Sequence, residues 1–166
     1  VNDQTGKRVL NAYDQLDDYF LLLYGDNYWT IELGAMWSNY QRLGANVSTT
    51  VFSNKNGTGE YGFGNNVVVS DNNYVVQYDK QRETDAANGV DMGYFLVAKN
   101  TLDPEMPGNV SFEIDILPEL IAKKQLGAYV TDTQYYYITN MQTLKVFENA
   151  AEKNNFLPLP QNYFGA

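Results

Sequence analysis

The sequence has 166 residues and 44% hydrophobic content, as expected for one globular domain with a core of its own. Its 20 acidic and 11 basic residues give a net charge of −9, which opposes binding to nucleic acid or to an anionic membrane. The chain contains no histidine and no cysteine, which excludes thiolate chemistry, disulfides, histidine bases and ordinary zinc sites. We therefore expect no catalytic residue, no metal and no cofactor.

The first predicted element is an amphipathic helix over residues 9–23. Five apolar residues recur at intervals of four, three, four and three, the spacing of one helical seam: Val9, Tyr13, Leu16, Phe20 and Leu23. Three further leucines flank this seam, because neighbouring residues on a helix point about 100° apart. Leu10, Leu21 and Leu22 are therefore the candidate subunit interface.

A second, shorter helix is predicted over residues 31–43, with Thr30 as its N-cap and Gly44 ending it. Residues 1–44 are accordingly expected to form a helical N-terminal region. Residues 45–166 are expected to form mainly an antiparallel sheet with two short helices.

Short segments rich in β-branched and aromatic residues predict the strands of this sheet. They are residues 47–52, 67–70, 74–78, 94–98, 110–116 and 134–139. A hairpin is expected across Asp71-Asn72-Asn73, since Asp and Asn tolerate turn geometry. In 110–116 apolar and polar residues alternate, which predicts that Phe112 and Ile114 are buried.

Two helices complete the prediction. Pro118 is expected to open a short helix that reaches about Leu126, and Asn140 to cap the last helix. The tail from Asn154, with its two prolines, is expected to be extended. The fold class is therefore α+β in a single domain, 1–166, with an N-terminal amphipathic helix and a short second helix packed on an antiparallel sheet, and a C-terminal helix.

Two groups of side chains are functional candidates. Glu113 and Asp115 would lie about 7 Å apart on one strand face, as in a glycosidase pair, but such carboxylates are usually only solvated. Tyr135, Tyr136 and Tyr137 are consecutive and must show rings on both faces of a strand. They are a candidate exposed aromatic surface, as used in sugar binding and in protein interfaces.

The order of these parts resembles the globular head of a type IV pilin, most closely of the type IVb group. The resemblance rests on the glycine-rich stretch that leads into Gly62-Phe63-Gly64-Asn65-Asn66-Val67-Val68-Val69, and on residues 110–116 running into Leu117-Pro118-Glu119-Leu120. It implies a non-catalytic, extracellular filament subunit that assembles with like subunits. The sequence departs from pilins in having no cysteine near residues 121–123 and no hydrophobic anchoring half-helix.

Other classes stay open beside the filament subunit. A virus or phage capsid or tail protein fits the same composition, and so does a secreted carbohydrate- or peptide-binding module. An enzyme would have to work with carboxylates or tyrosines alone. The expected location is the outside of a cell or virion, without direct membrane contact, because the longest apolar run is far shorter than the roughly 20 residues of a bilayer span.

Overall fold

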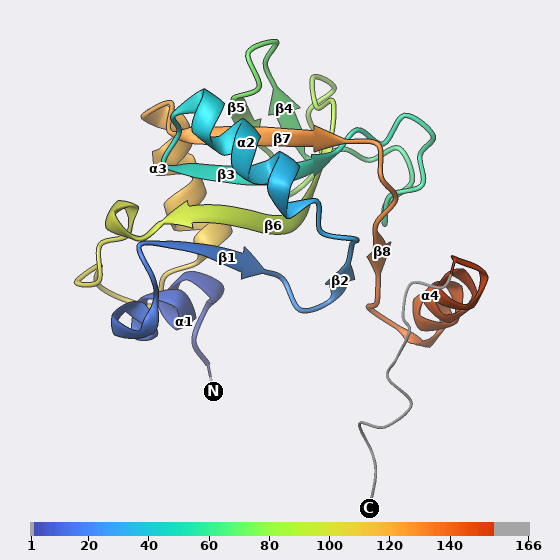
Figure 1. Cartoon of the computed structure of the whole chain (residues 1–166), viewed down its shortest axis with the longest axis horizontal. Coiled ribbons are helices and arrows are strands. Elements are labelled where there is room, and N and C mark those ends of the chain that lie inside the picture. The colour runs from blue at the N-terminus through green and yellow to red at the C-terminus, as the bar shows by residue number, and fades with distance from the viewer. Residues whose placement is uncertain (1, 155–166) are drawn as a thin grey trace, which may run out of the picture.

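A mixed four-stranded sheet lies at the centre of the structure, a computed structural model that describes residues 2–154 (Figure 1). The strand order is β1-β6-β3-β7, with bounds Tyr19–Leu23, Val90–Ala98, Val47–Phe52 and Leu126–Thr131. Strand β6 is antiparallel to both β1 and β3, whereas β3 and β7 are parallel. Strands β1, β3 and β7 therefore run in one direction, and their carboxyl ends meet at the same edge of the sheet.

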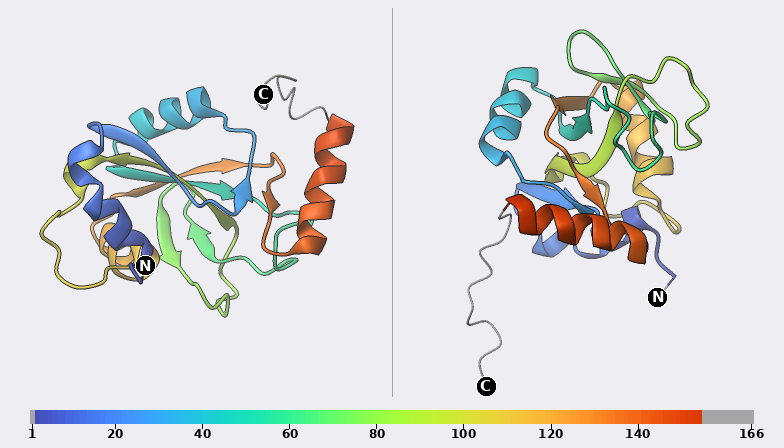
Figure 2. Two further views of the ribbon diagram at one scale, coloured as in Figure 1. Left: turned by 90° about the horizontal axis from the view of Figure 1, so that it is seen from below. Right: turned by 90° about the vertical axis from the view of Figure 1, so that its right-hand side faces the viewer.

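Helices cover both faces of this sheet (Figure 2). The helices are α1 (Thr5–Asn11), α2 (Leu33–Leu43), α3 (Leu117–Ala122) and α4 (Met141–Asn154). On one face, Met36 and Tyr40 of α2 pack with Trp29 and Tyr94. On the other face, residues of α1 and α3 join a second core around Phe95.

Two small sheets flank the central one. Strands β4 (Val67–Val69) and β5 (Val75–Tyr78) form a hairpin inserted between β3 and β6. Strands β2 (Asn27–Tyr28) and β8 (Tyr136–Tyr137) pair near the carboxyl ends of the central strands. Helix α4 contacts this second pair, since the ring of Phe147 lies 4.9 Å from the ring of Tyr28.

Several local predictions are confirmed. Strand β3 has the predicted bounds, and the hairpin forms across Asp71-Asn72-Asn73. Helix α2 ends at Gly44, whose φ of 65° is the left-handed conformation that glycine adopts readily. The Asn140 side chain accepts hydrogen bonds from the backbone N–H groups of Gln142 and Thr143 at 2.9 and 3.0 Å, as an N-cap does. Helix α2 begins two residues later than predicted, and Thr30 does not cap it.

The prediction of a long first helix is wrong. Only Thr5–Asn11 is α-helical, and Tyr19–Leu23 forms strand β1. Five consecutive apolar residues also describe a strand covered on both faces, and periodicity cannot separate the two over so short a run. The expected helical region 1–44 is therefore divided between helices and strands.

The strand predicted over residues 110–116 is also wrong. Residues Phe112–Ile116 form a π-helical turn that continues into α3, and the Ser111 hydroxyl accepts a hydrogen bond from the Ile114 N–H at 3.3 Å. Phe112 and Ile116 are buried because they are four residues apart and share one helical face. Ile114 is 62% exposed, contrary to expectation.

The sheet is mixed and not antiparallel, because β7 runs parallel to β3. No strand was expected at residues 126–131, which follow helix α3 after a short connection. The predicted extended tail with Pro158 and Pro160 lies outside the described residues. None of the helices within residues 2–154 has the length and apolar character that crossing a bilayer requires.

Candidate functional site

A cavity of about 420 Å³ lies at the edge where the carboxyl ends of β1, β3 and β7 meet. Ligands of open α/β sheets bind at such edges, because the loops that follow the strands converge there. The lining comes from the segment after β1, the loops on either side of the β4–β5 hairpin, the start of β6 and the turn before α3. The lining residues are Tyr24, Asp26, Asn27, Glu60, Tyr61, Asn66, Tyr78, Lys80, Gln81, Arg82, Asp91 and Glu113.

Asp26 is held in place by its neighbours in the chain. The Tyr24 N–H donates to the Gly93 carbonyl at 2.8 Å, and the Asn27 side chain donates to the Met92 carbonyl at 3.0 Å. The Asp26 carbonyl accepts from the Ile138 N–H at 2.7 Å. The backbone is thus tied to β6 and to the segment before α4, while the Asp26 residue itself is exposed.

Lys80 and Arg82 come from the loop after β5, which Asp79 organises. The Asp79 carboxylate accepts from the N–H groups of Gln81, Glu83 and Thr84 at 2.8 to 3.0 Å, and these bonds hold its pKa below the usual value. The Arg82 guanidinium donates to the Gly64 carbonyl and lies 4.3 Å from the centre of the Tyr61 ring. The loop therefore presents two cations to the cavity.

Two carboxylates in the cavity are tied to hydroxyl groups. Asp91 accepts from the Thr49 hydroxyl at 2.6 Å and from the Gly93 N–H at 3.1 Å, but burial still raises its pKa to about 6. Glu113 accepts from the Tyr78 hydroxyl at 3.3 Å and pairs with Lys80 at 2.6 Å. Burial, followed by the charges of these two carboxylates, raises the pKa of Tyr78, so its hydroxyl acts as a donor.

Glu60 and Asp26 are two further acidic residues that line the cavity. Burial is the main cause of a raised pKa for Glu60, and the charge of Asp26 adds to it. Within residues 2–154 no group of three or more acidic side chains is placed to hold a metal ion. Magnesium, however, commonly takes one or two carboxylates from the protein and completes its shell with waters and substrate phosphates. Asp26 and Glu60 could supply the one or two carboxylates that such a magnesium ion takes from the protein.

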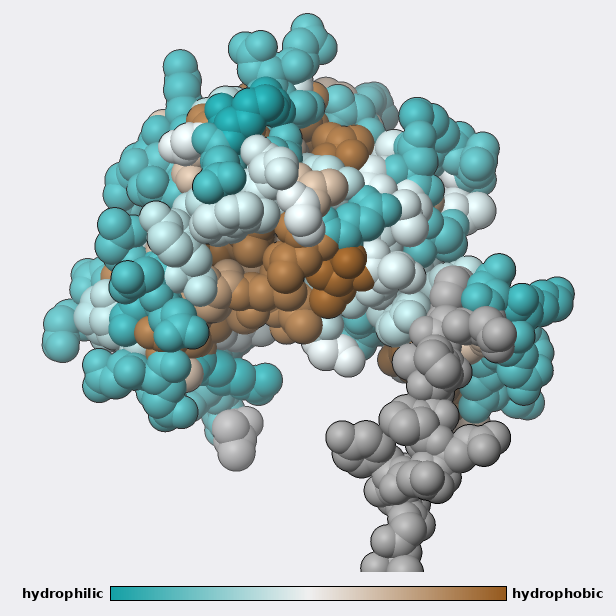
Figure 3. Space-filling model, viewed as in Figure 1, coloured by the Kyte–Doolittle hydropathy of each residue, from teal (hydrophilic) through white to brown (hydrophobic). Residues whose placement is uncertain are grey.

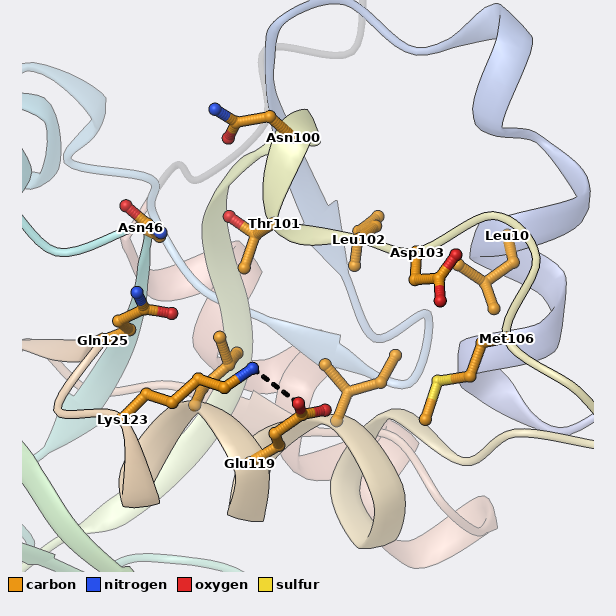
Figure 4. Close-up of a pocket in the computed structure, with 12 residues that line it drawn as sticks. Leu10, Asn46, Asn100, Thr101, Leu102, Asp103, Met106, Glu119, Lys123 and Gln125 are labelled. Carbon is orange, nitrogen blue, oxygen red and sulfur yellow. Dashed lines mark hydrogen bonds and ion pairs between the residues drawn. The ribbon is translucent and has the colours of Figure 1, made fainter.

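A larger cavity of about 560 Å³ lies at the opposite end of the sheet (Figure 4). Asn46 and Gln125, which line it, immediately precede β3 and β7. Its basic side chain, Lys123, is paired with Glu119 at 2.5 Å (Figure 4). The charged residues that line this end are Lys123, Glu119 and Asp103, whereas the carboxyl-edge cavity has two cations and four carboxylates, so we place the functional site at the carboxyl edge.

The residues singled out from the sequence are scattered. Leu10 is buried in the core under α1, and Leu21 and Leu22 are half-buried in β1 and join the cores on opposite faces. These three leucines therefore do not form one exposed surface, and their role in assembly stays a prediction. Tyr135 is buried, and its hydroxyl accepts from the Glu60 N–H at 3.2 Å.

Tyr136 and Tyr137 are half-buried and line a small cavity of about 310 Å³ beside α4. Their use as a ligand surface is likewise untested. Of the carboxylates weighed from the sequence, Glu113 lies in the site, whereas Asp115 accepts from the Ser111 N–H beside it.

Sequence reasoning missed Asp26, Lys80, Arg82 and Asp91. One signal was present, because Gly25-Asp26 follows the apolar run 19–23 after a single residue, Tyr24. In open α/β sheets the residues that bind ligands lie in the loops that follow the carboxyl ends of the strands. Interpreting that run as a helix concealed the signal.

No family model matches the sequence, and no curated protein matches it significantly. Solved structures do match the fold. HddC from Yersinia pseudotuberculosis is 17% identical with a TM-score of 0.66, and the match covers 90% of this chain and 62% of that one. HddC complexed with GMP-PN is 18% identical, with the same TM-score and coverage.

A protein from Bacillus anthracis described as a glucose-1-phosphate thymidylyltransferase, solved with sucrose, is 12% identical with a TM-score of 0.72. That match covers 95% of this chain and 65% of the other. The chain thus spans less than two thirds of each matched structure. At these identities the likeness establishes the fold alone.

These matches overturn the pilin resemblance. The matched structures are described as HddC and as a glucose-1-phosphate thymidylyltransferase and not as pilins, so the interpretation as a non-catalytic filament subunit is wrong. The pilin interpretation depended on a long first helix and on a strand at residues 110–116, and neither exists. The expectation that the protein is not an enzyme is corrected on the same ground.

Proposed function

We propose that the protein is a nucleotidyltransferase whose carboxyl-edge cavity binds a sugar phosphate. The observation that carries the proposal is the convergence of Lys80 and Arg82 with the acidic pair Asp26 and Glu60 in one cavity. The descriptions of two matched structures support it, since one is called a glucose-1-phosphate thymidylyltransferase and the other contains GMP-PN.

The two cations suit a phosphate in different ways. Lys80 offers a compact charge at a half-exposed position, whereas Arg82 offers a planar fork that can donate two parallel hydrogen bonds. Arg82 is already oriented by the Gly64 carbonyl and the Tyr61 ring, so little conformational freedom would be lost on binding. Glu113 keeps Lys80 at the cavity wall until a phosphate competes for its ammonium group.

In the proposed reaction an oxygen of the sugar phosphate attacks the α-phosphorus of a nucleoside triphosphate. The new phosphorus–oxygen bond forms as the bond to the β-phosphate breaks, and pyrophosphate leaves. Lys80 and Arg82 would hold the sugar phosphate and offset its charge, which otherwise repels the triphosphate. Asp26 and Glu60 would hold a magnesium ion, which when bound neutralises charge on the triphosphate.

The proposal is tested by calorimetric titration of the protein with glucose 1-phosphate and with dTTP or GTP, each with magnesium. We expect Lys80→Gln to weaken binding of glucose 1-phosphate about tenfold, the loss that follows from removing one charged hydrogen bond of about 1.4 kcal/mol. Lys123→Gln is the control, because the Lys123 side chain is 56% exposed against 54% for Lys80 and also pairs with a glutamate, but lies at the opposite end of the sheet. It should leave the affinity unchanged.

Activity is measured as pyrophosphate release by the complete encoded polypeptide, given glucose 1-phosphate and dTTP or GTP. If neither glucose 1-phosphate nor either nucleotide binds, the proposal is contradicted. An equal loss of affinity in the two lysine variants would also contradict it. An affinity loss confined to Lys80→Gln, together with pyrophosphate release, supports it.

A further inference from the structure

The loop of residues 53–66, which joins β3 to β4, forms part of the carboxyl-edge cavity. It supplies Glu60, Tyr61 and Asn66 to the lining. Its two large aromatic residues are mostly exposed, Tyr61 by 60% and Phe63 by 74%. The loop projects past the carboxyl ends of β3 and β7 in Figure 1, and the surface there is mainly hydrophilic in Figure 3. Hydrogen bonds therefore do more than apolar packing to hold this loop in place.

The side chain of Asn54 makes the hydrogen bonds that fold the loop. Asn54 is buried, with 2% exposure, and its Oδ1 accepts from the Gly59 N–H at 3.0 Å. Its Nδ2 donates to the Gly62 carbonyl and to the Asn65 Oδ1, both at 2.9 Å. The carboxamide thus uses both its acceptor and its donors on the loop. It joins one point before Glu60 to two points after it.

The backbone of Asn54 has a φ of 52°, in the left-handed region that is uncommon for residues other than glycine. Within residues 2–154 this region also holds Asn73, Arg82 and Lys124. Asn73 lies in the β4–β5 turn and Lys124 two residues after the end of α3, where this conformation is common. Asn54 and Arg82 lie instead in the two loops that line the carboxyl-edge cavity. Non-glycine residues held in this region cluster at binding and active sites.

The order of this loop affects both kinds of charged group in the cavity. Glu60 belongs to the loop, and its N–H donates to the Tyr135 hydroxyl at 3.2 Å. Arg82 belongs to the loop after β5, but its guanidinium contacts the Tyr61 ring and donates to the Gly64 carbonyl. Both of these partners are in the same loop as Glu60. A change in this loop therefore displaces a carboxylate and a cation together.

We propose that Asn54 is a positioning residue of the carboxyl-edge site, and that it couples the binding of magnesium to the binding of the sugar phosphate. The inference rests on the proposed function, in which Glu60 helps to hold the ion and Arg82 the phosphate. Asn54 does not line the cavity and touches neither ligand. Its carboxamide sets the place of Glu60 directly and that of Arg82 through Tyr61. Loss of the carboxamide therefore weakens both ligands at once.

Asn54→Gly tests the inference, because glycine adopts a φ of 52° without strain and removes only the carboxamide. Asn73→Gly is the matched control, since Asn73 has a φ of 61° but its side chain makes no hydrogen bond within residues 2–154. Calorimetric titration of Asn54→Gly should show severalfold weaker binding of glucose 1-phosphate. The magnesium concentration that half-saturates binding of dTTP or GTP should rise severalfold. The control should change neither quantity.

Double variants separate positioning from a general loss of stability. If Asn54 acts on the phosphate through Arg82, adding Asn54→Gly to Arg82→Gln should weaken binding of glucose 1-phosphate no further. Adding it to Glu60→Gln should likewise leave the magnesium dependence of nucleotide binding unchanged. Hydrogen exchange at the Gly59 amide, which loses its acceptor in Asn54→Gly, should become faster and reports the order of the loop without any ligand.

If Asn54→Gly does not fold, Asn65→Ala takes its place, because it removes one partner of the Asn54 carboxamide and should cause smaller losses of the same kind. Unchanged affinities in the folded variant, with ligands bound by the wild type, would overturn the inference and leave the proposed function intact. Additive losses in the double variants, or a loss for only one of the two ligands, would also overturn it. Absence of all binding by the wild type would reject the proposed function and this inference with it.

Discussion

The two ends of the central sheet each carry a cavity and a lysine–glutamate pair, but the surroundings of the pairs differ. At the carboxyl edge, the Glu113 side chain is only 18% exposed and also accepts the Tyr78 hydroxyl, and Arg82 adds a second cation. At the opposite end, Lys123 and Glu119 are both 56% exposed and one helical turn apart on α3. The first pair belongs to a network fixed by several strands, and the second is an ordinary surface pair.

This difference follows from the direction of the strands. Three of the four central strands end at the carboxyl edge, so loops from distant parts of the sequence must meet there. The larger of the two cavities lies at the other end and gathers fewer charged side chains. Volume is therefore a poorer guide to the site than the convergence of charged groups is.

The largest expected effect tests whether the carboxyl-edge network depends on the core beneath it. Phe112 is fully buried, its ring lies 5.2 Å from that of Phe95, and it precedes Glu113. Phe112→Ala should cost about 3–5 kcal/mol in the free energy of unfolding, measured in urea, because it leaves a cavity. Ile114→Ala, at an exposed position two residues away, should change it by less than about 0.5 kcal/mol. Similar losses would mean that the turn is misassigned.

The next effect is the pH dependence of the free energy of unfolding that results from Asp91 at the carboxyl edge. Well below pH 3.8 this carboxyl is protonated in both the folded and the unfolded protein and contributes no difference. Above pH 6 it is ionised in both, and the folded state bears the cost of the buried charge. Stability is therefore lost as the pH rises through this window, by about 3 kcal/mol at most for a pKa raised from 3.8 to about 6.

Asp91→Asn should remove this loss, because an amide oxygen can still accept from Thr49 and Gly93 without carrying a charge. The stability gained over the wild type, measured in urea at pH 4 and pH 7, should be larger at pH 7. An equal difference at both values would show that Asp91 does not titrate in this range.

A smaller effect is expected from the loop that carries the two cations. Asp79→Ala should increase hydrogen exchange at the amides of Gln81, Glu83 and Thr84, which lose their acceptor. It should also weaken binding of glucose 1-phosphate severalfold, since Lys80 and Arg82 lose their ordered loop. Asp103→Ala is the control at the opposite end, where Asp103 accepts from the Glu105 N–H at 3.0 Å. An equal loss of affinity for glucose 1-phosphate in both variants would contradict the placement of the binding site at the carboxyl edge.

The smallest effect concerns the surface pair on α3. Lys123→Gln removes an exposed pair four residues apart and should cost about 0.3–0.5 kcal/mol in the free energy of unfolding. Thermal denaturation at low and high salt would measure it, since salt screens an exposed pair. A loss well above 1 kcal/mol would show that this end of the sheet is more than an ordinary surface.

Sequence reasoning succeeded where a local signal decides the structure. Gly44 ends α2 because glycine adopts the left-handed conformation without strain, and Asn140 caps α4 through its own side chain. It failed at residues 19–23 and 110–116, where the spacing of apolar residues is compatible with both a helix and a strand. At residues 126–131 the strand forms because β3 provides a parallel partner, and that partner is about 79 residues away.

The sequence by itself determined the acidic character of the protein, the lack of imidazole and thiol groups, and the ends of several elements. Any metal site must therefore be built from oxygen ligands. Only the tertiary structure decided that Asp26, Lys80, Asp91 and Glu113 line one cavity. They are far apart along the chain, and each one looks like an ordinary solvated charge among its sequence neighbours. Pairing of β1 and β3 with β6 brings their loops to a common edge, because strand direction and register are properties of the whole sheet.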